Sequence, residues 1–107
     1  MIIKSTHGKS LHGGHQAGTT FEANSGHLIE VVTMKRYGGN LRTTVSHGIR
    51  INQYMIESEW DATFKTFDHG RERATKTTVL RAHAIVTGEV RNDIESGKIR
   101  IRSEVTA

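Results

Sequence analysis

The stretch from His27 to Ile56 reads HLIEVVTMKRYGGNLRTTVSHGIRINQYMI, and it decides the fold. Two runs rich in β-branched and apolar residues flank the pair Gly38-Gly39, whose freedom to adopt positive φ angles suits a hairpin turn. In the second run, apolar side chains occupy odd positions, namely Leu41, Val45, Ile49, Ile51 and Met55. Because side chains alternate between the two faces of a strand, this period predicts a long β-hairpin over about 28–56 with one buried face.

The turn determines which residues lie opposite one another in this hairpin. With Gly38 and Gly39 as the two turn residues, Glu30 lies opposite His47. A shift of the turn by one residue moves Glu30 opposite Ile49 but leaves both Glu30 and His47 on the apolar face. We therefore expect a carboxylate and an imidazole to share that face.

Residues 57–70, ESEWDATFKTFDHG, change from a period of two to a helical period. Ser58 and Asp61 have the spacing of a capping box, and Gly70 suits the end of a helix. The aromatic side chains then fall on one stripe that is typical of core packing: Trp60, Phe64 and Phe67. We expect a helix over about 58–69, with His69 near its C-terminus.

The rest of the chain predicts one more helix and one more strand. Residues 71–87 have a broad apolar face, which predicts a second helix, and residues 98–105 alternate as an edge strand does. Residues 5–27 are rich in Gly, His, Ser and Thr, which favours a flexible loop. With both helices packed on one face of an antiparallel sheet, the expected fold class is α+β in a single domain, 1–107.

Composition narrows the classes of function. The chain has 15 Lys and Arg against 11 Asp and Glu, and its pI of about 9.8 favours an anionic partner such as nucleic acid or an acidic protein surface. It has no cysteine, which excludes disulfides and thiolate zinc sites. No apolar run reaches the roughly 18 residues of a membrane span, and the N-terminus lacks the apolar region of a secretory signal. We expect a cytoplasmic protein that does not bind membranes.

Basic side chains gather at two places in the predicted fold. At the hairpin tip, Lys35, Arg36 and Arg42 lie close together, with Arg50 further along the same outer face. The last strand carries a basic stripe on its polar face: Lys98, Arg100 and Arg102. Because basic strand faces position phosphates, these residues form the predicted anion-binding site.

Two alternatives to anion binding remain open. The first is a metal-independent ribonuclease with a base, an acid and a phosphate ligand: Glu30, His47 and Arg50. The second is a metal-binding protein with histidine ligands in the glycine-rich segment: His7, His12 and His15. The sequence HGKS at 7–10 lacks the first glycine of a phosphate-binding loop, and no cofactor is expected. We expect His83 to be a partly buried structural residue.

Together these patterns favour a small, non-catalytic binding module for an anionic surface, either nucleic acid or an acidic protein. Its size and lack of a catalytic motif are compatible with an accessory or inhibitory protein of a mobile element. The exposed last strand would also allow two copies to pair as a homodimer.

Overall fold

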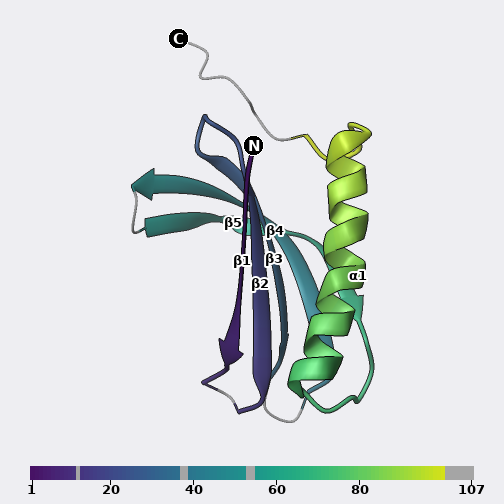
Figure 1. Cartoon of the computed structure of the whole chain (residues 1–107). Coiled ribbons are helices and arrows are strands. Elements are labelled where there is room, and N and C mark those ends of the chain that lie inside the picture. The colour runs from purple at the N-terminus through teal and green to yellow at the C-terminus, as the bar shows by residue number, and fades with distance from the viewer. Residues whose placement is uncertain (12, 37–38, 53–54, 101–107) are drawn as a thin grey trace.

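The computed structural model describes residues 1–11, 13–36, 39–52 and 55–100, with 55–64 limited to the backbone. Five antiparallel strands follow one another in space in chain order, and a single helix packs on one face of the sheet (Figure 1). The elements are β1 (Ile2–Lys9), β2 (His15–Glu22), β3 (His27–Lys35), β4 (Leu41–Asn52), β5 (Met55–Asp68) and α1 (Lys76–Glu95). The α+β class is confirmed, but the described residues contain one helix rather than two.

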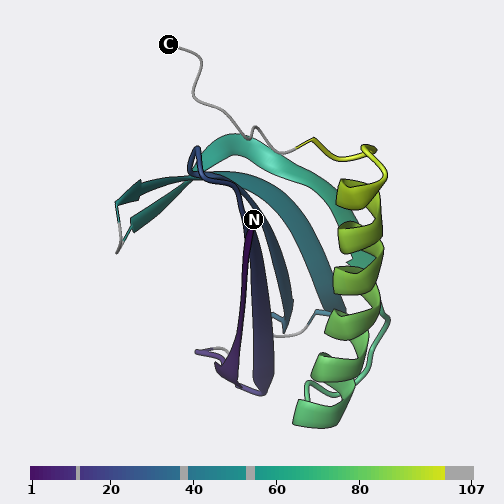
Figure 2. The same ribbon diagram turned by 45° about the horizontal axis from the view of Figure 1, so that its top comes forward.

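The core lies between the sheet and α1. Odd-numbered residues of β2, β3 and β4 lie on the face that packs against the helix, which we call the helix face, although Ile49 and Ile51 near the end of β4 are exposed. Even-numbered residues lie on the outer face. The main cluster of buried side chains is Phe21, Ile29, Val31, Val45, Val86 and Val90. Each such side chain contributes about 1.5–3 kcal/mol when it leaves water, so the cluster anchors the helix to the sheet. Figure 2 shows that the sheet is strongly bent, with α1 running alongside it.

The helix expected over 58–69 is wrong, because residues 58–68 belong to strand β5. The register between β4 and β5 shifts near Ser46 and again near Arg50, so the regular period of two is interrupted. When a strand's alternation of apolar and polar residues is interrupted, its apolar residues can fall three or four positions apart, which is also the spacing of a helix. Phe67 nevertheless packs against the main core cluster, as expected, whereas the side chains of Trp60 and Phe64 lie outside the described residues.

Helix α1 confirms the second expected helix but begins and ends later than 71–87. Thr75 caps its N-terminus, because the Thr75 hydroxyl accepts from the Thr78 N–H and the Thr78 hydroxyl accepts from the Thr75 N–H. The helix continues through Gly88 and buries Val90 beyond it. Burial of Val90 offsets the cost of about 1 kcal/mol for a glycine inside a helix. Among the described residues, no helix is both long and apolar enough to span a bilayer.

The predicted hairpin is confirmed as β3 and β4, but its register differs by one residue from the prediction. Ile29, rather than Glu30, lies directly opposite His47. A one-residue change moves a side chain to the other face, so Glu30 is on the outer face and His47 on the helix face. The expectation that they share a face is wrong.

Both ends of the sequence also differ from expectation. Most of 5–27, expected to be a loop, forms strands β1 and β2, which pair along their whole length. At the C-terminus, residues 98–100 follow the helix and are not in a strand, and the remainder of the predicted strand 98–105 lies outside the described residues. The edge strands of the described sheet are β1 and β5.

Candidate anion-binding site

The β1–β2, β3–β4 and β5–α1 connections meet beside the N-terminus of α1. The backbone N–H of His15, at the start of β2, donates to the carbonyl oxygen of Ala74 at 2.7 Å. Lys35, at the end of β3, donates from Nζ to the carbonyl oxygen of Glu72 at 3.1 Å. These contacts join the β1–β2 and β3–β4 hairpins to the segment that leads from β5 into the helix.

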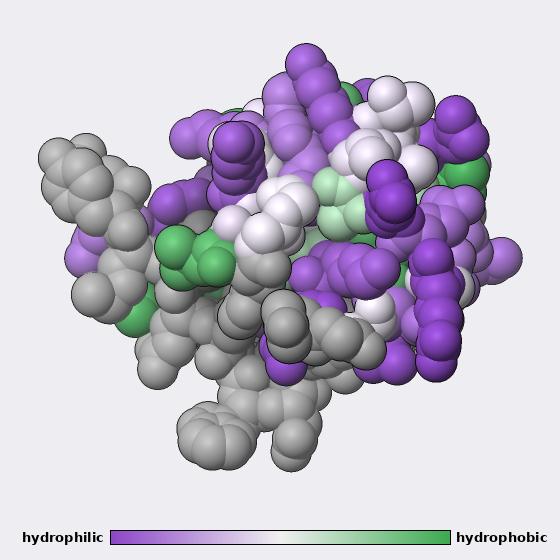
Figure 3. All heavy atoms as spheres, turned by 90° about the horizontal axis from the view of Figure 1, so that it is seen from below, coloured by the Kyte–Doolittle hydropathy of each residue, from purple (hydrophilic) through white to green (hydrophobic). Residues whose placement is uncertain are grey.

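This junction carries a high density of positive charge, and we call it the basic end. Its basic side chains come from both hairpins, the β5–α1 segment and the first residue of the helix: Lys9, Lys35, Arg36, Arg71, Arg73 and Lys76. Two carboxylates lie at the same end, Glu72 and Asp68, and Asp68 already contacts Asn40 and Arg42. Figure 3 views the molecule from this end, where hydrophilic side chains cover most of the coloured surface.

The helix N-terminus adds to this positive potential. Its first turn contains no acidic residue that would offset the helix dipole. The Thr75 hydroxyl already accepts from one of the N-terminal N–H groups of the helix. The helix therefore adds to the positive potential through its dipole and does not form a separate anion-binding pocket.

The structure separates the predicted anion-binding residues into three groups. Lys35 and Arg36 lie at the basic end. Lys35 pairs with Leu41 and is on the helix face, whereas Arg42 pairs with Met34 and is on the outer face. Lys98 and Arg100 are exposed beyond the other end of α1. Arg102 lies outside the described residues.

The outer-face arginines are bound to carboxylates. Arg50 forms an ion pair with Glu22, which is almost fully buried, and Arg42 lies 3.5 Å from Asp68. The backbone N–H of Gly70 and the amide of Asn40, followed by the charge of Arg42, lower the pKa of Asp68. A carboxylate beside each guanidinium leaves the outer face less suited to anions than the basic end.

The residues of the ribonuclease alternative are not brought together. His47 lies on the helix face, where its Nδ1 is 3.1 Å from the Nε2 of His27, while Glu30 and Arg50 lie on the outer face. An acid and a base on opposite faces of one sheet cannot act on the same phosphate.

Two of the three proposed metal ligands do meet. The Nδ1 of His7 lies 2.9 Å from the Nε2 of His15, and His12 lies outside the described residues. Within the described part of the chain, no group of three or more His, Asp or Glu side chains is placed to hold a metal ion. Partial burial, followed by the charges of His7 and Lys76, lowers the pKa of His15.

The sequence patterns do not indicate a chain of hydrogen bonds that crosses the helix face and is buried at its centre. It links one hydroxyl from each of β1 to β4 to two imidazoles, in the order Ser5, Thr19, His83, Thr33, Thr43 and His69, with atoms 2.7–2.9 Å apart. His83 is buried as expected, whereas His69 contacts Thr43 instead of ending a helix. The sequence signal for this chain is a threonine that replaces an apolar residue at one odd-numbered position of β2, of β3 and of β4.

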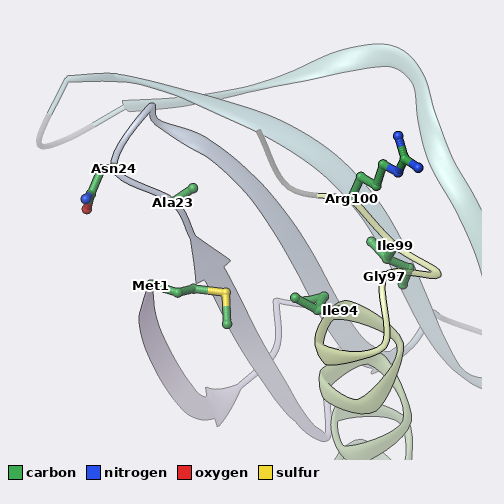
Figure 4. Close-up of a pocket in the computed structure, with 7 residues that line it drawn as sticks. All are labelled: Met1, Ala23, Asn24, Ile94, Gly97, Ile99 and Arg100. Carbon is green, nitrogen blue, oxygen red and sulfur yellow. The ribbon is translucent and has the colours of Figure 1, made fainter. Parts of the chain in front are cut away.

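A cleft of about 400 Å³ lies beside the C-terminal end of α1, at the opposite end of the molecule from the basic end. Figure 4 shows the residues that line it. Met1, Ala23, Ile94 and Ile99 give it a mainly apolar lining, to which Arg100 adds one guanidinium. Among the described residues, this lining includes no carboxylate or imidazole.

Comparison with models of known protein families found no match to the chain, and comparisons with curated proteins and with solved structures found none either.

Proposed function

We propose that the protein is a non-catalytic nucleic-acid-binding module that contacts phosphates with its basic end. The observation that carries this proposal is the density of basic side chains where the two hairpins and the β5–α1 segment meet at the helix N-terminus. Phosphate contacts supply most of the sequence-independent affinity of such proteins for nucleic acid.

The chemistry of the basic end supports nucleic acid as the partner. Arg71 and Arg73 are exposed, and their planar guanidinium groups suit bidentate contact with phosphate oxygens. Lys9 and Lys76 are also exposed and supply further point charges nearby. The net charge of +4 favours the approach of a polyanion to this end.

The test compares two double variants that remove equal charge from opposite ends of the molecule. Fluorescence anisotropy with a labelled DNA duplex would measure the affinity of the wild type, of Arg71→Ala/Arg73→Ala and of Lys98→Ala/Arg100→Ala across salt concentrations. We expect the first pair to weaken binding about tenfold or more and to reduce the salt slope by roughly two. The second pair should change affinity only slightly, since those residues are distant from the basic end.

Two results would contradict the proposal. Equal losses in both double variants would mean that net charge, not the basic end, governs binding. An absence of binding by the wild type at low salt would exclude nucleic acid and leave an acidic protein surface as the partner to test.

A further inference from the structure

The pair His7 and His15 lies inside the basic end, on the helix face of β1 and β2. Their rings are tilted by 38°, with centroids 5.0 Å apart, and the facing nitrogens are 2.9 Å apart. A contact of this kind needs one N–H donor and one unprotonated nitrogen. If both nitrogens carry a proton, the bond is lost and each ring presents an N–H to an outside acceptor.

Charged residues lie on the elements that surround this pair. Lys9 on β1 lies directly opposite His15, and Lys76 opens the helix whose leading segment binds the His15 backbone. The other charged groups nearby are Lys35 of β3 and the β5–α1 residues Glu72 and Arg73. The charges of His7 and Lys76 disfavour a proton on His15, and a bound phosphate would reverse that preference.

We propose that His7 and His15 form a proton-linked phosphate contact, so that the basic end takes up protons when it binds nucleic acid. This inference rests on the proposed function. The ligand groups are the backbone phosphates, which accept from the Nδ1–H of His7 and the Nε2–H of His15 once the two rings turn from each other.

Linkage gives the size of the expected effect. Each proton taken up on binding makes the affinity rise about tenfold for each unit by which the pH falls. The phosphodiester groups of DNA stay ionised in the histidine range, so this dependence would come from the protein. Histidines at the far end of the sheet contribute little, because salt screens charges beyond about 10 Å.

The experiment measures affinity for a DNA duplex between about pH 5.5 and 8, the range in which histidine titrates, at fixed ionic strength and with a label whose emission is independent of pH. The variants are His7→Gln/His15→Gln and, as a matched control, His27→Gln/His47→Gln, which removes the other imidazole pair. We expect the wild type and the control to bind more tightly as the pH falls, and the His7/His15 variant to lose most of this slope. Calorimetry of the wild type in buffers with different heats of ionisation gives the proton uptake directly, even if a variant fails to fold.

The outcomes separate this inference from the proposed function. Binding with no proton uptake, or an unchanged slope in the His7/His15 variant, overturns the inference and leaves nucleic-acid binding intact. No binding by the wild type at any pH overturns both.

Discussion

His83 and Thr33 meet between the helix and the sheet, where the Nδ1 of His83 lies 2.8 Å from the Oγ1 of Thr33. On the other side of the same ring, Nε2 lies 2.7 Å from the Oγ1 of Thr19. A neutral imidazole has one N–H, so it donates on one side and accepts on the other, and the hydroxyls continue the bonds in a single direction. At the buried centre of this chain, each hydrogen bond therefore fixes the direction of the next.

The substitution Thr33→Val should break this chain at its centre. The Nδ1 of His83 and the Oγ1 of Thr43 are buried, and each loses its hydrogen bond to Thr33. We expect this loss to reduce the free energy of unfolding by about 1–3 kcal/mol. Urea denaturation followed by circular dichroism measures the change. Thr44→Val is the control, because Thr44 lies on the outer face and should change stability by less than about 0.5 kcal/mol. Equal effects in the two variants would show that the chain adds nothing.

Stability should fall on acidification because of His83. Burial lowers the pKa of His83 from its usual value of about 6.5, so between the lowered value and 6.5 the unfolded state binds more protons than the folded state. Stability therefore rises with pH through this window and is fully present above pH 6.5. Urea midpoints at several pH values test this, and His83→Gln should flatten the dependence. An unchanged slope in His83→Gln would assign the effect to other groups.

Several elements of the fold are predictable because a single physical signal specifies them. The hairpin follows from the alternation around Gly38 and Gly39, and the existence of α1 follows from its apolar face. The register is not predictable in the same way, because a difference of one residue at the turn moves Glu30 and His47 to opposite faces. Strand β5 is hidden by irregular pairing that breaks its period.

The candidate site is only partly predictable from the sequence, because residues far apart in the chain assemble it. Lys35 and Arg36 are identified from the hairpin alone, but Arg71, Arg73 and Lys76 join them through long-range contacts such as the one between Lys35 and Glu72. The histidine pair is likewise made by the β1–β2 register, which places His7 diagonally across from His15. Contacts of this kind depend on tertiary packing, which local patterns do not encode.

Gly14 should tolerate substitution less well than its neighbour Gly13. Both have positive φ angles, of 77° and 80°, so alanine at either position costs about 1–2 kcal/mol of backbone strain. At Gly14 an added Cβ would also lie 2.8 Å from the Cβ of Ala74, whereas nothing lies within 4 Å at Gly13. We expect Gly14→Ala to be less stable than Gly13→Ala by about 1 kcal/mol or more, and to bind DNA more weakly because it displaces the β5–α1 segment. Thermal or urea unfolding of the two variants measures the difference, and equal stability would contradict the close approach.

Two adjacent residues of α1 test which side of the helix packs on the sheet. Ile85 and Val86 are adjacent apolar residues, but Ile85 is 66% exposed and Val86 is 1% exposed. Val86→Ala removes two buried methyl groups beside Phe21 and Ile29 and should cost about 2 kcal/mol of unfolding free energy. Ile85→Ala should change stability by less than about 0.5 kcal/mol, since the lost side chain is mostly in water and alanine favours the helix. Urea unfolding of both variants gives the comparison, and a larger loss for Ile85→Ala would mean that the helix packs through a different face.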